Sequence, residues 1–153
     1  LNAKANMNSG AAIRCLDQAS LAYSGASTQT IGFATSTTSG SLTINSGAIA
    51  FERNAKWHSP VVTVNGGSLI VRPSASTNTF GVGRATETSL FVNGTGRLEL
   101  QSGAYTSTVR TVTFDGKLLK RGVYSAENCQ FITGEGALRA VSGRPDGVTI
   151  VVR

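Results

Sequence analysis

The segment 51–60 gathers the side chains of this chain that are best suited to chemistry. It reads FERNAKWHSP and contains Trp57 and His58, which are the single tryptophan and the single histidine of the 153 residues. The charged and amide side chains that accompany them are Glu52, Arg53, Asn54 and Lys56. An aromatic ring beside amide and guanidinium groups suits the binding of polar, ring-shaped ligands. The segment is therefore the first candidate for a functional site.

Two interpretations are open for each of the two rings. Trp57 either points outward toward a ligand or covers an apolar corner where the chain bends, and we favour the outward orientation. His58 is followed by Ser and Pro, a context that is typical of turns. It is therefore either a turn residue or a ligand-binding group.

The acidic residues predict no catalytic pair. Glycoside hydrolysis needs two carboxylates at a defined separation, and a calcium-dependent lyase needs a cluster of them. The chain has eight acidic residues, all dispersed, and both Asp115 and Asp146 precede a glycine as turn formers do. No serine motif for nucleophilic catalysis accompanies His58. We therefore predict that the chain is not an enzyme and has no catalytic residue.

Charge and cysteine usage limit the partners. The net charge of +6 favours anionic partners, but the basic residues are scattered singly and no nucleic-acid-binding motif is present. Cys15 and Cys129 match no zinc spacing, so we predict two buried free thiols, no metal and no cofactor. No apolar run approaches the ~20 residues that span a membrane. We predict neither a nucleic-acid partner nor a membrane partner.

An internal repeat organises the chain. Four segments share a glycine, one further residue and a leucine, and these leucines (Leu42, Leu69, Leu98 and Leu138) lie 27, 29 and 40 residues apart. A second set of apolar pairs alternates with polar residues, which predicts half-buried strands. Its members are Ile31/Phe33, Val62/Val64, Leu90/Val92 and Val112/Phe114.

Dipeptides that favour turns allow two architectures. Asn65-Gly66, Asn93-Gly94 and Asp115-Gly116 are hairpin signals, which would indicate an antiparallel sandwich. A repeat of this length holds too many strands for one hairpin and suits one coil of a right-handed parallel β-helix. We favour the all-β, short parallel β-helix with about four coils, in which Leu42, Leu69 and Leu98 stack on one another.

The chain reads as one β-helix domain with two caps. Residues 1–27 form the N-terminal cap and first coil, with a weak helical stripe in Ala12, Ile13 and Leu16. Residues 28–110 form the regular coils, and 111–153 the last coil and a C-terminal cap made of a hairpin and a final strand, GVTIVVR. Because the chain opens on Leu1 without Met or a signal peptide, we expect it to be part of a larger precursor.

The repeated sequence pattern seen in LTINSGA, VNGGSLIV and VNGTGRLELQSGA resembles the β-helical repeats of bacterial autotransporter passengers and of surface proteins from gut bacteria. The stretch VTFDGKLLKRGVYSAENCQFITGEGALRAV is similar to the segment that closes many such arrays. In size and style the chain is also similar to β-helical carbohydrate-binding modules appended to secreted plant-cell-wall hydrolases, particularly xylanases. The resemblance implies a secreted bacterial protein, a polysaccharide ligand and a linked catalytic domain in the parent chain.

Alignment of the second strands of successive coils assembles the candidate site. Coils stack about 4.8 Å apart, close to the length of one sugar unit in an extended β-1,4-linked chain. Arg53 aligns with Arg84 if Phe51 and Val82 both point inward, and Arg110 follows in the next coil. The residues expected to bind carbohydrate are Trp57, Arg53, Asn54, Lys56, His58, Arg84, Glu87, Tyr105 and Arg110.

Phe91 is a second candidate platform. Leu90 and Val92 should face inward, so Phe91 faces outward on the side where Thr63 and Thr113 emerge. It either meets a sugar or packs beneath the terminal hairpin, and we favour packing.

The sequence thus predicts a non-catalytic carbohydrate-binding module for plant cell-wall polysaccharide, of the xylan type. A structural segment of a bacterial surface adhesin or autotransporter passenger is the alternative, and a polysaccharide lyase or glycosidase is the third. The same aromatic and arginine residues would also suit a protein-contact patch.

Overall fold

In a computed structural model, the chain is an all-β protein of stacked strands. The structure describes residues 21–31, 35–36, 41–51, 56–57, 60–72, 88–101 and 107–144. Every regular element in these ranges is a β-strand, which confirms the predicted class. The predicted helical stripe (Ala12, Ile13 and Leu16), Phe33 and the predicted final strand lie outside the described residues.

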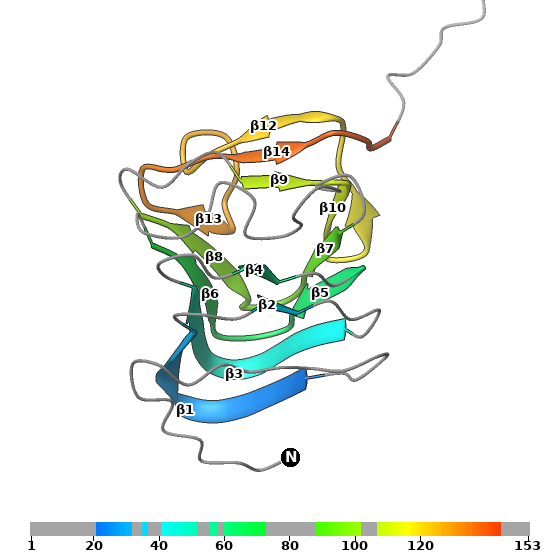
Figure 1. Cartoon of the computed structure of the whole chain (residues 1–153). Coiled ribbons are helices and arrows are strands. Elements are labelled where there is room, and N and C mark those ends of the chain that lie inside the picture. Colours follow the sequence, from blue (N-terminus) through cyan, green and yellow to red (C-terminus); the bar gives the residue numbers. More distant parts are fainter. Residues whose placement is uncertain are drawn as a thin grey trace, which may run out of the picture.

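A long, curved strand organises the largest sheet. β3 (Ser41–Phe51) pairs in parallel with β1 (Leu21–Ile31) on one side. On its other side it has two partners, because its first half pairs with β5 (Val61–Val64) and its second half with β6 (Ser68–Val71). The sheet therefore divides into two arms above β3 and curls around the core (Figure 1).

Each arm continues as a parallel stack. The first arm runs from β5 to β7 (Ser89–Val92) and β10 (Thr111–Phe114), where β11 (Lys117–Leu118) pairs in antiparallel fashion. The second arm runs from β6 to β8 (Arg97–Leu100) and β13 (Ile132–Thr133). In Figure 1 the first arm rises on the right and the second arm on the left.

Smaller sheets complete the architecture. β2 (Thr35–Ser36) pairs in parallel with β4 (Lys56–Trp57). β14 (Leu138–Ala140) lies between β9 (Ser107–Val109), to which it is parallel, and β12 (Gly122–Tyr124), to which it is antiparallel. In Figure 1 this three-stranded sheet lies at the end of the stack opposite β1.

The core lies between the arms. Strands β5, β6, β7 and β8 each alternate half-buried and buried residues, so the period-two pattern of the sequence is confirmed. Stacked strands bring equivalent apolar side chains above one another, where each covers the apolar surface of the next. The two main columns are Leu42, Val62, Leu90 and Val112 in the first arm, and Ile49, Leu69, Leu98 and Ile132 in the second.

The predicted column of Leu42, Leu69 and Leu98 is wrong at its first member. Leu69 does pair with Leu98, but its partner on β3 is Ile49. Leu42 pairs with Val62 in the other arm. The cause is that β3 is one unbroken strand where a turn separates β5 from β6. The glycine-x-leucine motif therefore lies at the start of β3 but at the start of β6, so its leucines fall in different arms.

Two further members of the aligned motifs take other places. Leu138, the fourth leucine of the repeat, pairs with Ser107 in the small sheet, and Ile132 stacks on Leu98. Ile31 pairs with Phe51 and therefore belongs to the second arm. Alternation along one strand predicts which residues face the core, whereas it does not identify the partner strand.

The three turn dipeptides behave differently. Asp115-Gly116 forms a two-residue hairpin between β10 and β11, with φ of 45° and 75°, as a type I′ turn requires. This agrees with the predicted C-terminal hairpin. Asn65-Gly66 and Asn93-Gly94 instead connect β5 to β6 and β7 to β8, and these strands pair in parallel, β5 with β7 and β6 with β8. The described strands therefore do not form an antiparallel sandwich.

An asparagine ladder follows the turns between the arms. Asn65 Nδ2 donates to Asn45 Oδ1 at 2.9 Å, and Asn93 Nδ2 donates to Asn65 Oδ1 at 2.9 Å. Asn45 Nδ2 donates to Ser24 Oγ at 3.2 Å. At the other end stands Asp115, whose Oδ1 accepts from the Gly94 N–H at 2.6 Å. An ionised carboxylate carries no hydrogen-bond donor, so Asp115 cannot continue the series of side-chain hydrogen bonds and the ladder ends there.

Candidate functional site

The predicted cluster at 51–58 is described in part. Phe51 is fully buried, so it points inward as predicted. Lys56 and Trp57 form β4 and pair with Thr35 and Ser36 of β2. Their side chains lie outside the described residues, as do Arg53, Asn54, His58, Val82, Arg84, Glu87 and Tyr105. The outward orientation of Trp57, and the column of Arg53 and Arg84, stay predictions.

Phe91 faces outward, as predicted, in a column of the first arm. It pairs with Thr63 on one side and with Thr113 on the other, and Thr43 continues the column. Phe91 is half-buried, whereas Thr113 is buried, with 9% of its surface exposed. β10 lies between Phe91 and the hairpin strand β11. The column thus presents one aromatic ring beside the half-buried Thr63, with the buried Thr113 on its other side, whereas the packing of Phe91 beneath the hairpin stays a prediction.

The outer face of the second arm is polar and internally paired. Glu99 stands between Ile70 and Thr133, and its Oε1 accepts from Gln101 Nε2 at 2.8 Å. Arg97 Nη1 donates to the Gly96 carbonyl oxygen at 2.8 Å. These hydrogen bonds hold the longest polar side chains of the face along the strands.

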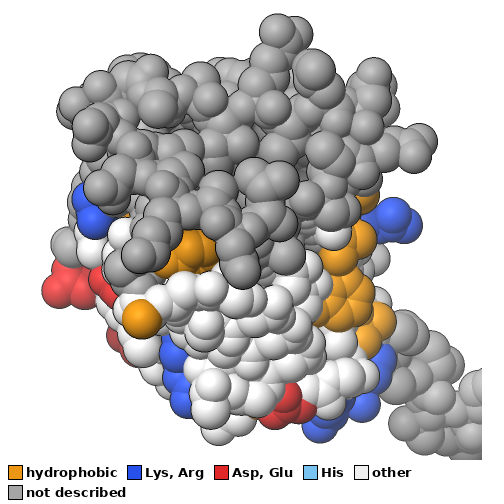
Figure 2. Space-filling view, turned by 90° about the horizontal axis from the view of Figure 1, so that it is seen from below, with side chains coloured by type: hydrophobic (Ala, Val, Ile, Leu, Met, Phe, Trp, Pro, Cys, Tyr) orange, Lys and Arg blue, Asp and Glu red, His pale blue; other side chains and the backbone are white. Residues whose placement is uncertain are grey.

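Charged side chains occupy the rim of the face seen in Figure 2. In this view from below, blue and red side chains surround a described surface that is mainly white, with hydrophobic orange beside the grey part. This spread fits the sequence observation that basic residues are scattered singly.

Arg110 is exposed and has a defined neighbour. It directly follows β9, and the register of β9 with β14 continues one residue beyond the strands. The Val141 N–H donates to the Val109 carbonyl at 3.0 Å, and the Ser142 N–H donates to the Arg110 carbonyl at 2.8 Å. Arg110 therefore lies beside Val141.

Two further arginines share this surface. Arg139 of β14 pairs with Thr108 of β9 and with Val123 of β12, and all three face away from the buried Ala140. One step beyond the strand pair, Arg121 lies opposite Val141. We call this surface the arginine face, and its residues are Thr108, Arg110, Arg121, Val123, Arg139 and Val141.

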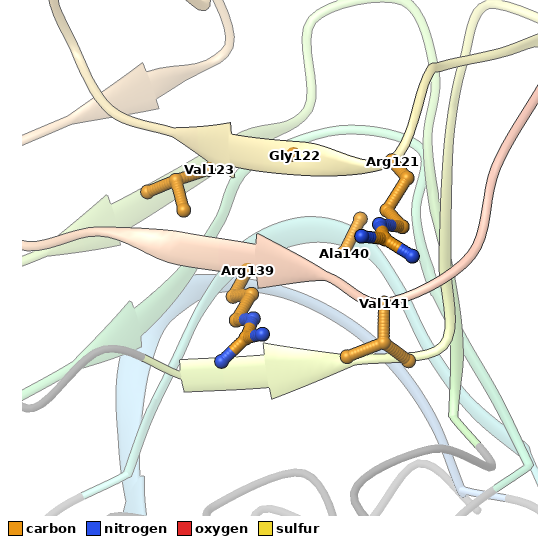
Figure 3. A pocket seen from close by; sticks show the side chains of 6 residues that line it. All are labelled: Arg121, Gly122, Val123, Arg139, Ala140 and Val141. Atoms are coloured by element: carbon orange, nitrogen blue, oxygen red, sulfur yellow. The ribbon is translucent and has the colours of Figure 1, made fainter. Parts of the chain in front are cut away.

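A hollow lies on the arginine face. The described residues that line it are Arg121, Gly122, Val123, Arg139, Ala140 and Val141. Figure 3 shows the side chains of Arg121 and Arg139 extending the same way across the sheet, with Arg139 directed toward β9. Val123 is 54% exposed beside them. The hollow therefore combines guanidinium groups with bare apolar surface.

Sequence reasoning missed Arg121 and Arg139. The alternation of Leu138 and Ala140 in GALRAV is a local signal that Arg139 faces outward. No local signal indicates that Arg121 lies alongside Arg139, because the two residues are 18 positions apart and only the antiparallel pairing of β12 with β14 brings them together.

Two weakly acidic side chains, Tyr124 and Cys129, have raised pKa values. Burial raises the pKa of Tyr124, Cys129 raises it further, and Lys120 lowers it. The Tyr124 hydroxyl donates to the Lys120 carbonyl oxygen. Burial also raises the pKa of the Cys129 thiol, against a lowering by the Phe131 backbone. Cys129 is free and half-buried, whereas Cys15 lies outside the described residues.

Metal-ligating residues are dispersed in the part of the chain that the structure describes. No group of three or more His, Cys, Asp or Glu comes together there. Over the same ranges, no helix has the length and apolar character needed to cross a membrane.

Comparisons with family models, with curated proteins and with solved structures find no match to this chain. The resemblance to autotransporter-type repeats and to β-helical carbohydrate-binding modules therefore stays a prediction from the repeat rhythm. Function has to be argued from the chain's own surfaces.

Proposed function

We propose that this chain is a non-catalytic carbohydrate-binding module on a short right-handed parallel β-helix. In this proposal it has about four coils and binds a plant cell-wall polysaccharide of the xylan type. The observation that carries the proposal is the in-register parallel stacking of both arms, which repeats equivalent outward residues from strand to strand.

The order of strands along the chain supports the coil. β7, β8 and β9 belong in turn to the first arm, the second arm and the small sheet. β10, β13 and β14 then visit the same three stacks one level higher, each parallel to its predecessor. A return to three stacks in the same order is what the three-sided coil of a β-helix would give, so this order supports the proposed fold.

The spacing of the stack supports a sugar ligand. Neighbouring strands lie about 4.8 Å apart, so a column of outward residues meets successive units of an extended β-1,4-linked chain. The half-buried members of the outer column, Thr43, Thr63 and Phe91, combine hydroxyl groups with one aromatic ring. Trp57 would supply a second ring from β4.

Two of the described carboxylates, Glu99 and Asp115, serve the scaffold. Glu99 accepts from the Gln101 amide, and Asp115 accepts from the Gly94 N–H. Hydrolysis would use two carboxyl groups facing each other across a cleft. Both of these carboxylates have positioning roles in the scaffold.

Affinity electrophoresis in gels containing xylan, glucomannan, cellulose or pectin tests the proposal. We expect retardation by xylan, and Trp57→Ala should reduce it while leaving the thermal midpoint nearly unchanged. Leu118→Ala, at an exposed residue of β11, is the control. Lack of retardation by every polymer would contradict the proposal and favour the structural adhesin segment. Unfolding of Trp57→Ala would place the ring in the core.

A further inference from the structure

The arginine face brings together three positive charges without an acidic neighbour in its hollow. Arg139 pairs directly with Thr108 and Val123, and Arg110 and Arg121 lie on either side of Val141 in the next row. Residues directly opposite on neighbouring strands have Cβ atoms about 5 Å apart, and diagonal neighbours about 7–8 Å. Arg139 is thus a diagonal neighbour of both other arginines. The described residues that line the hollow include no Asp or Glu.

This arrangement is unfavourable for the free protein and suited to an anion. Like charges that share one face of a sheet repel each other. A carboxylate placed between guanidinium groups removes that repulsion and accepts paired hydrogen bonds from each planar fork. The face therefore has a charge requirement that the hollow's own described residues leave unmet.

The apolar residues of the face limit the kind of anion. Val123 is 54% exposed, and Val141 is half-buried between Arg110 and Arg121. Valine side chains offer nothing to a small hydrated anion, whereas the C–H face of a sugar ring gains by covering them. The described residues of this face hold no aromatic ring on which a nucleic-acid base would stack.

We propose that the arginine face binds the carboxylate groups of an acidic polysaccharide, one that bears uronic acid units. The inference rests on the proposed carbohydrate-binding function and specifies the ligand class. Arg110 and Arg121 are separated by two strand spacings, roughly 10 Å, which is about two sugar units. Arg139 lies between them, so one carboxylate is shared by at least two of the guanidinium groups.

The test compares one polymer in two forms. Glucuronoxylan and the same glucuronoxylan with its carboxyl groups reduced to alcohols are titrated into the intact chain by calorimetry at low salt. We expect the native polymer to bind about three- to ten-fold more tightly than the reduced one. Arg139→Gln and Arg121→Gln should each remove most of that difference, and added salt should weaken it.

Lys117→Gln is the matched control, because Lys117 is exposed on β11, a strand of the larger sheet and not of the arginine face, and its loss changes the net charge equally. It should keep the preference for the native polymer. Equal binding of both polymers would overturn the inference while leaving the proposed function standing. The inference would also be overturned, with the proposed function left standing, if Lys117→Gln lost as much of the preference for the native polymer as Arg139→Gln. Equally tight, arginine-dependent binding of single-stranded DNA would overturn the assignment to a sugar, and no binding of either polymer would contradict both proposals.

Discussion

Asn65 and Asn45 are 20 residues apart in the chain, and the side-chain amide of Asn65 donates to the side-chain oxygen of Asn45 at 2.9 Å. The side-chain oxygen of Asn65 in turn accepts a hydrogen bond from the side-chain amide of Asn93 at 2.9 Å. A carboxamide carries both a donor and an acceptor, so identical residues at equivalent turn positions can link several strands in series. The turn asparagines of the sequence are therefore structural links between neighbouring turns of the stack.

Replacement of Asn65 tests this ladder. Asn65→Ala removes both hydrogen bonds and should lower the free energy of unfolding by about 1–2 kcal/mol. Asn65→Asp keeps the acceptor for Asn93 but loses the donor to Asn45, so its loss should be about half as large. Urea denaturation measures both, with the exposed turn substitution Thr95→Ala as control. An aspartate variant as stable as the unchanged chain would show that the Asn45 link contributes nothing.

Gly67 and Gly116 form a matched pair for the close packing of turns. Both have positive φ, 73° and 75°, so alanine is strained at either position. A Cβ at Gly67 would collide with the Gly47 carbonyl oxygen, whereas a Cβ at Gly116 meets no atom within 4 Å.

Gly116→Ala should therefore lower the free energy of unfolding only by the strain of an alanine at positive φ, about 1–2 kcal/mol. Gly67→Ala should cost clearly more, because the stacked turns must also separate. Thermal unfolding followed by circular dichroism compares the two variants. Equal losses would mean that the turns shift apart freely.

Leu90 and Phe91 are consecutive residues that face opposite sides of β7. Leu90 is fully buried between Val62 and Val112, so Leu90→Ala should cost about 2–5 kcal/mol of stability. Phe91→Ala removes a half-buried ring on the outer face and should cost less.

If the outer column binds sugar, the variant with the smaller loss of stability should show the larger loss of binding, measured at a temperature where both variants are folded. Phe91→Ala should then reduce retardation by xylan more than Leu90→Ala does. Unchanged retardation, combined with a large loss of stability in Phe91→Ala, would assign the ring to packing alone.

Alkaline pH should destabilise the fold through Cys129 and Tyr124. Burial raises the pKa of both groups, so the folded state holds each proton more tightly than the unfolded state does. Their stabilising contribution is present below the ordinary thiol and phenol pKa values, about 8.5 and 10, and is lost as pH rises through the raised ones.

The measurement is the urea midpoint between pH 8 and about 10.5, where the unfolded thiol and phenol lose their protons. Cys129→Ala should make the decline of that midpoint shallower from about pH 8.5 upward, and Tyr124→Phe only nearer pH 10. Identical pH profiles for all three proteins would contradict the assigned burial effect.

Local pattern was enough to predict the class of the fold and the side on which single residues face. The alternation at Val62/Val64 and Leu90/Val92 predicted buried positions that the structure confirms, and it placed Phe91 outward. The type I′ hairpin at Asp115-Gly116 was likewise predictable, because the two residues themselves tolerate positive φ. Of the predicted carbohydrate-binding residues, Arg110 is the one whose side chain lies in the described ranges, where it is exposed.

Amino-acid sequence alone thus determined an all-β chain of half-buried strands, because side-chain period and turn preference are properties of neighbouring residues. Only the tertiary structure decided that Leu69 stacks on Ile49 and that Leu42 belongs to the other arm. Only it brought Arg121 alongside Arg139, through the antiparallel pairing of β12 with β14. Register between strands far apart in the chain depends on the length of every intervening turn and on the packing of the whole core, which no short stretch of sequence encodes.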